Sequence, residues 1–142
     1  MSEQTEPRAE LARRIEAIES GYEFLLAYAA QGRQTDRGAG QGRSVRDFLE
    51  RMAEALDGLG AVATASAKRA EPPLDAVGEA FFAALDRDAR VARSAIALVL
   101  ARSDISSQLV DNLNASIHLR ALLTDLFVVD EALQPKAPAR GD

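Results

Sequence analysis

The sequence predicts an all-α protein, more specifically an antiparallel four-helix bundle, and three observations favour this class. Apolar residues recur at helical spacing over four long stretches, at about 7–31, 45–69, 74–102 and 105–133. Glycines, prolines and capping residues stand between these stretches, where helices would begin and end. No stretch has the alternation of apolar and polar residues, bounded by turns, that is typical of a strand. Four such helices with short connections pack by default as an antiparallel bundle.

Length and composition indicate one helical domain over residues 1–142, with residues 1–6 and 135–142 as flexible tails. Hydrophobic residues make up 47% of the chain and charged residues 27%, as in ordinary globular proteins. The chain has no cysteine, which excludes a disulfide framework, a catalytic thiolate and a cysteine-based metal centre.

Charge and hydropathy limit the classes of partner. The net charge of −5 disfavours nucleic-acid binding, because neutralising phosphates requires a basic face. The first ten residues are acidic and polar, whereas a signal peptide needs a basic start and an apolar run. No uninterrupted apolar stretch reaches the roughly 18 residues of a membrane span. We therefore expect a cytoplasmic protein that binds neither nucleic acid nor membranes.

The first predicted helix, 7–31, carries a single apolar seam whose members step by four and three residues. Pro7 suits its first turn, and Gly32 is a plausible stop. Gly21 lies inside the pattern at a cost of up to about 1 kcal/mol relative to alanine, so it is expected to mark a close helix crossing. The seam consists of Leu11, Ile15, Ile18, Tyr22, Leu25 and Ala29.

The second predicted helix, 45–69, follows a Gly/Arg-rich loop at 33–43. Ser44 and Asp47 match a capping box, so the helix is expected to begin at about Val45. Gly58 and Gly60 weaken its second half, and two prolines at 72–73 forbid continuation.

The third and fourth predicted helices, 74–102 and 105–133, are separated only by Ser103 and Asp104, either of which can serve as an N-cap. A tight reversal is expected there, and a single kinked helix is the competing interpretation. The segments 94–101 and 117–133 are apolar on more than one face, which exceeds what one four-helix core requires. We expect this surplus to be buried in a homodimer, at Ile96, Val99, Leu119, Leu122, Leu126 and Val129.

The loop at 33–43 concentrates positive charge immediately before a helix N-terminus. Free N–H groups and the helix dipole could bind a phosphate-type anion there, with Arg33, Arg37, Arg43, Ser44 and Arg46 as candidate ligands. The segment does not match the phosphate-binding motif G-x-x-x-x-G-K-[ST], because arginines stand at the first glycine and at the lysine positions. A solvated loop whose arginines keep it soluble is the competing interpretation.

Two single residues complete the candidates. Arg120 is the only basic residue of the fourth helix and lies in its apolar half, so it is expected to form a buried ion pair with another helix or subunit. His118 is the only histidine and could share a helix face with Asp111 and Asn114. The chain lacks both H-E-x-x-H and the Glu-x-x-His pairs of di-iron bundles, so no metal or other cofactor is expected.

No group of residues supplies both an activated catalytic group and a partner that orients it, so no catalytic residue is assigned and an enzyme is not expected. The sequence instead favours a homodimeric helical protein that acts by protein–protein interaction, in assembly, scaffolding or regulation of a protein partner. The alternative is a small-molecule or anion-binding bundle that uses the arginine loop.

Overall fold

A computed structural model describes residues 6–38 and 44–134, and within these ranges the chain is all-helical, with six helices and no strand. The helices are α1 (Glu6–Ala29), α2 (Val45–Leu56), α3 (Leu59–Lys68), α4 (Glu79–Leu100), α5 (Ser107–Ala115) and α6 (Ile117–Ala132). The all-α class is therefore confirmed. Six helices stand in place of the four predicted, so the four-helix bundle is not confirmed. The tails and Arg43 lie wholly or largely outside the described residues.

The extra helices arise because two predicted helices are broken. The predicted helix 45–69 divides into α2 and α3 at Gly58, whose φ of 74° places it in the left-handed region that favours glycine. Arg14 of α1 donates to the carbonyl oxygens of Ala55 (3.2 Å) and Asp57, which partners the carbonyls freed at the end of α2. The break is therefore both permitted by a glycine and stabilised by an arginine from another helix.

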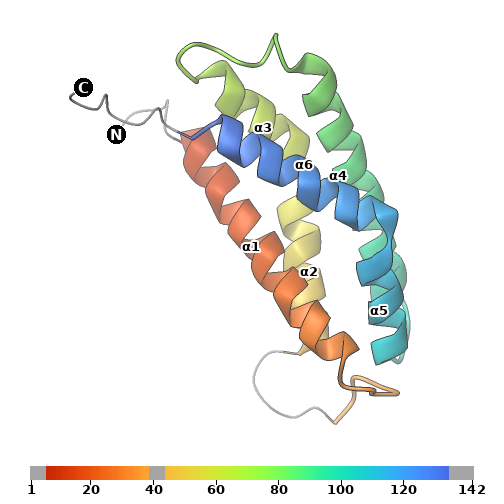
Figure 1. Cartoon of the computed structure of the whole chain (residues 1–142). Helices are drawn as coiled ribbons and strands as arrows, with labels where there is room; N and C mark the ends of the chain where they lie inside the picture. Colours follow the sequence, from red (N-terminus) through yellow and green to blue (C-terminus); the bar gives the residue numbers. More distant parts are fainter. Residues whose placement is uncertain (1–5, 39–43, 135–142) are drawn as a thin grey trace, which may run out of the picture.

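The predicted helix 105–133 divides into α5 and α6 at Ser116, which has an extended ψ of 129°. The hydroxyl of Ser116 accepts from the N–H of His118 at 3.2 Å, and its own N–H donates to the carbonyl of Leu113. One serine thus ends α5 and caps α6. The change of direction sends α6 obliquely across the molecule (Figure 1).

The remaining boundaries differ less from the prediction. The chain reverses between α4 and α5 as expected, but the N-cap is Ser106, whose hydroxyl accepts from the N–H of Leu109, and not Ser103 or Asp104. The capping box of Ser44 and Asp47 is confirmed. The start at Leu74 was wrong, because residues 75–78 form turns and α4 begins at Glu79.

Two long helices organise the core. α1 packs against α2, α3 and α5, whereas α4 packs against α2, α3 and α6. Buried apolar side chains from all six helices form one cluster between them. The largest fully buried members are Ile18, Leu25, Leu49, Met52, Leu56, Leu59, Leu85, Ile96, Ile105, Leu119, Leu122 and Leu126.

Two helical glycines allow close approach between helices. A Cβ at Gly21 would lie 2.4 Å from Cγ of the fully buried Met52, which confirms the predicted close crossing, here between α1 and α2. A Cβ at Gly60 would lie 2.4 Å from Cβ and 2.8 Å from Cα of Asp86. Because the second neighbour is backbone, α3 and α4 can keep this separation only with glycine at position 60.

Gly60→Ala should lower the free energy of unfolding by about 1–3 kcal/mol, because the new methyl group must push α3 away from α4. The exposed neighbour Ala61 provides the matched control, since Ala61→Gly reports only the difference of about 1 kcal/mol in helix propensity. Urea unfolding measures both variants. An increase in stability for Gly60→Ala, as helix propensity alone would give, would contradict the close crossing.

Candidate functional site

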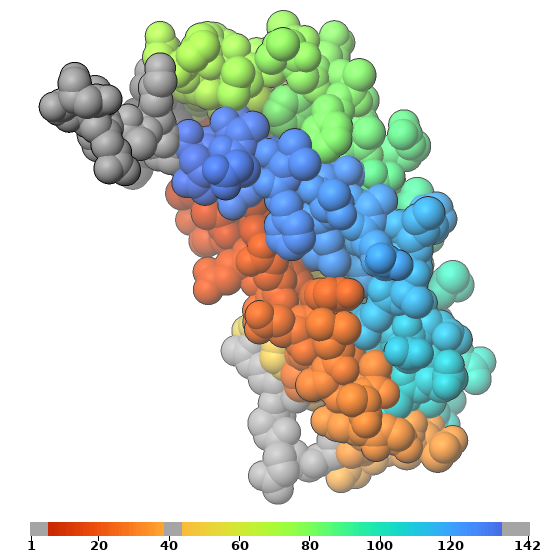
Figure 2. Space-filling view, in the orientation of Figure 1, coloured from red at the N-terminus to blue at the C-terminus, as the bar shows by residue number. Residues whose placement is uncertain are grey.

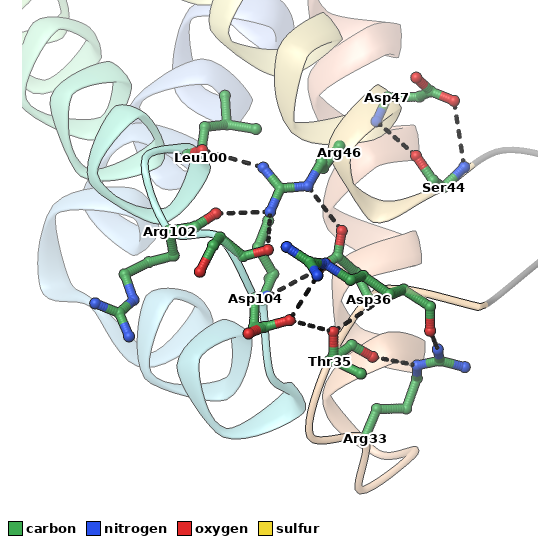
Figure 3. Close-up of polar contacts among 12 residues, drawn as sticks. Arg33, Thr35, Asp36, Ser44, Arg46, Asp47, Leu100, Arg102 and Asp104 are labelled. Atoms are coloured by element: carbon green, nitrogen blue, oxygen red, sulfur yellow. Dashed lines mark hydrogen bonds and ion pairs between the residues drawn. The ribbon is translucent and has the colours of Figure 1, made fainter.

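The predicted anion site contains a cluster of internal contacts at one end of the molecule (Figure 3). Arg46, in the first turn of α2, forms an ion pair with Asp36 at 2.7 Å. Its guanidinium also donates to the carbonyl oxygens of Leu100 (3.1 Å), Arg102 (2.6 Å) and Ser103 (3.1 Å). These carbonyls lie at the last residue of α4 and just beyond it, where the helix dipole favours a cation. Arg46 therefore caps α4.

Asp36 completes this connection from the other side. Its second carboxylate oxygen accepts from the N–H of Ile105 at 2.9 Å, and its side chain is only 9% exposed. Burial by itself raises the pKa of Asp36, but the hydrogen bonds from Ile105 and Arg46 outweigh it and hold the pKa below its usual value. Asp36 thus stays ionised and joins the α1–α2 connection to the α4–α5 connection.

The other predicted anion ligands are also engaged within the chain. Arg33 donates to the carbonyl oxygens of Thr35 and Arg37, and Arg37 lies 3.6 Å from the carboxylate of Asp104. The hydroxyl of Ser44 accepts from the N–H of Asp47 as the α2 cap. Arg33, Arg37 and Ser44 lie at the same end as Arg46, but their contacts serve the fold.

A second polar feature, an acid pair formed by Asp88 of α4 and Asp125 of α6, lies where these helices pack together. Both side chains are partly buried, and Oδ2 of Asp125 is buried without a hydrogen-bond partner among the described residues. Burial and the carboxyl of Asp88 raise the pKa of Asp125 to about 7, while Arg87 acts in the opposite direction. Asp125 therefore keeps its proton to a higher pH than an ordinary aspartate.

The six residues predicted to form a dimer contact are buried within the core of the single chain. Each has at most 4% of its surface exposed, because α6 turns its most apolar side towards α4 and the core. They therefore cannot present a surface to a second copy while the chain keeps this fold. These residues are Ile96, Val99, Leu119, Leu122, Leu126 and Val129.

Other apolar residues on the same two helices remain exposed. On α4, positions 81, 84, 88, 91, 95 and 98 step alternately by three and four residues and so lie along one line. On α6, positions 117, 121, 125 and 128 form a similar line. The two lines come together at Asp88 and Asp125, where α4 and α6 pack against each other. We call this surface the α4–α6 face; its exposed large members are Phe81, Val91, Leu98, Ile117 and Val128.

Arg120 does not form the predicted buried ion pair. Its side chain is exposed and forms no ion pair with a residue in the described ranges. Within one chain Arg120 points away from α4, on the side of α6 that faces α1, so it is not buried there. An ion pair with a second subunit stays a prediction. Arg120 lines an open groove of about 360 Å³ with Glu19, Tyr22, Glu23, Leu123, Thr124 and Phe127. Figure 2 shows this face, with α6 in blue beside α1 in red and orange.

His118 lies exposed in the first turn of α6, separated by the break at Ser116 from Asp111 and Asn114 on α5. Asn114 is buried and donates to the carbonyl of Leu25, so it serves the α1–α5 contact. Within the described residues, no cluster of three or more His, Cys, Asp or Glu side chains could hold a metal ion. In the same part of the chain, no helix combines the length and hydropathy needed to cross a membrane.

Searches of protein-family models, of curated proteins and of solved structures find no match to this chain. Sequence reasoning missed the acid pair, because Asp88 lies within an ordinary charged run and its partner is 37 positions away. The one local signal was an aspartate, Asp125, in the middle of an apolar helix.

Asp125→Asn should change how stability depends on pH. A raised pKa in the folded state means that the acid pair stabilises the fold fully below about pH 4 and loses this contribution as pH rises through about 7. The wild type should therefore be less stable at pH 8 than at pH 5, and the variant should recover on the order of 1 kcal/mol at pH 8.

Urea unfolding of both proteins at pH 5 and pH 8 measures this effect, at a protein concentration low enough to limit association. Asp130→Asn, a substitution on the same helix, provides the control and should keep the wild-type difference. If Asp125→Asn shows the same change with pH as the wild type, the raised pKa of Asp125 is contradicted.

Proposed function

We propose that this protein is a non-enzymatic helical protein that acts by protein–protein interaction, and that it associates with a second copy through the α4–α6 face. A cytoplasmic location is part of this proposal. The predicted homodimer is retained, but its contact is formed by the exposed residues of α4 and α6 in place of the six core residues.

The supporting observation is the concentration of exposed apolar side chains on one surface. Eight large hydrophobic residues are exposed in the described ranges, and five of them lie on the α4–α6 face. Leu98 and Ile117 are the most open of the five, at 72% and 73%. Leaving them in water is unfavourable by about 25 cal/mol for each Å² of apolar surface. Covering the α4–α6 face would therefore give a larger gain in free energy than covering any other group of exposed apolar side chains in the described residues.

The size of the face suits a dimer. Given the usual area of such side chains, the five leave roughly 500 Å² of apolar surface open. A standard interface buries about 800 Å² on each partner, and about 65% of a homodimer interface is apolar. The apolar part that one subunit must supply is thus about what the α4–α6 face offers.

The alternative of anion binding at the arginine loop is less well supported. Arg46 and Arg33 already donate to carbonyl and carboxylate oxygens of the chain. An anion would have to compete with these contacts and would release the cap of α4. An enzymatic function has no support from the described side chains, because neither polar feature combines a reactive group with an open pocket.

Leu98→Glu should convert the dimer into a monomer, because it places a charge at one of the two most exposed apolar side chains of the contact. Leu26→Glu is the matched control, since Leu26 is also an exposed leucine, at 48%, but lies on α1 outside the face. Size-exclusion chromatography with light scattering measures the mass of each protein. A wild type that is monomeric at 100 µM would contradict the proposal, as would a dimer that survives Leu98→Glu.

A further inference from the structure

We propose that the groove between α1 and α6 binds a small organic zwitterion with an apolar body, such as a free amino acid with a large apolar side chain. The ammonium group of this ligand lies against Glu19 and Glu23 of α1, and its carboxylate lies against Arg120 of α6. We call this site the α1–α6 groove. It is separate from the α4–α6 face, so the inference goes beyond the proposed function.

The α1–α6 groove exists because the two helices that border it do not pack closely. α1 packs against α2, α3 and α5, whereas α6 packs mainly against α4. The space between them opens on the face shown in Figure 2 and has a volume of about 360 Å³. Pockets that take small molecules span about 300–1,000 Å³. The α1–α6 groove therefore suits a ligand of amino-acid size.

Apolar side chains from both helices line the groove between its charges. Leu123 is buried and Tyr22 partly buried, whereas Phe127 is 55% exposed. Phe127 is also one of the exposed large hydrophobic residues that the α4–α6 face leaves uncovered. The apolar body of a ligand would remove this ring from water. An ammonium group beside the rings of Tyr22 and Phe127 would gain a cation–π contribution.

The two glutamates of the groove are not used by the fold. Glu19 and Glu23 are exposed, and neither forms an ion pair in the described part of the chain. By contrast, Glu10 on the same helix pairs with Arg13 and Arg14. Because Glu19 and Glu23 are four positions apart, they are neighbours on the helix surface, where like charges are destabilising. A cation bound between them removes this repulsion.

Arg120 supplies the opposite charge from α6. Its guanidinium has no ion-pair partner in the described ranges and can bind a carboxylate through two parallel hydrogen bonds. A ligand with only an ammonium group would meet the positive charge of Arg120, and a ligand with only a carboxylate would meet the two glutamates. A molecule with both groups complements both sides of the groove.

NMR titration of the full ¹⁵N-labelled chain at pH 7 tests the inference with four probes: L-phenylalanine, phenethylamine, 3-phenylpropanoate and glycine. The last three each lack one of the proposed features, namely the carboxylate, the ammonium group and the apolar body. L-Phenylalanine should shift the amides of 19–23 and 120–127 in a saturable way. It should bind more tightly than either singly charged analogue by about threefold, the effect of one exposed ion pair. Glycine should give no saturable shift.

Two substitutions assign the charges. Glu23→Gln should weaken the binding of L-phenylalanine and phenethylamine but not of 3-phenylpropanoate. Arg120→Gln should weaken the binding of L-phenylalanine and 3-phenylpropanoate but not of phenethylamine. The matched controls are Glu50→Gln and Arg51→Gln, which change exposed residues of α2 outside the groove and should leave every dissociation constant unchanged.

The absence of a saturable shift with L-phenylalanine up to 50 mM would overturn the inference. So would equal affinities for L-phenylalanine and its two singly charged analogues, or saturable shifts confined to residues outside α1 and α6. If no probe binds and Arg120→Gln lowers the mass measured by light scattering, the α1–α6 groove is a contact between copies of the chain, and the inference is again overturned.

Discussion

The direction of α6 is the constraint on which the rest of the structure depends, and Ser116 sets it. A single helix through both segments would keep α6 on the axis of α5, which packs mainly against α1. The extended backbone at Ser116 lets α6 pack on α4 instead, which buries Leu119, Leu122 and Leu126 in the core. The same packing brings Asp88 to Asp125, where the outer lines of the two helices meet. The turn at Ser116 thus determines the packing of the core, the position of the acid pair and the position of the apolar face.

Arginines hold this arrangement by capping helix ends. Arg14 partners carbonyls at the end of α2, and Arg93 donates to the carbonyl of Ala53 one turn earlier. Arg46 partners carbonyls at the end of α4 and just beyond it. Each joins segments more than 35 positions apart in the sequence. A helix that ends early leaves carbonyl oxygens without partners, and a guanidinium with several fixed donors can serve more than one of them. Positive charge that looks available for a ligand is therefore largely used to stabilise short helices.

Local features were predictable from sequence, whereas distant partners were not. The extent of α1 and the capping box at Ser44 depend on residues within a few positions. The close crossing at Gly21 depends on the space that one missing side chain leaves. Gly58 carried a visible signal for the first break, but Ser116 resembles any polar position on a helix surface. Arg46 was predicted to bind an anion. Its partners are instead the carboxylate of Asp36 and backbone carbonyls of a distant segment, which no sequence pattern displays. The six supposed contact residues were correctly seen as too apolar for solvent, but apolar character does not distinguish a core from an interface.

The central claim is that two copies meet at the α4–α6 face, and cysteine cross-linking tests it most directly because the chain has no cysteine of its own. Single cysteines would be placed at Val91, Leu98, Ala121 and Val128, with Leu26→Cys on α1 as the exposed control. In a symmetric dimer, residues near the two-fold axis lie close to their own copies. Mild oxidation should therefore give a disulfide-linked dimer in high yield for at least one position of the face and none for Leu26→Cys. Cross-linking at Leu26 alone, or equal low yields at all five positions, would contradict the account.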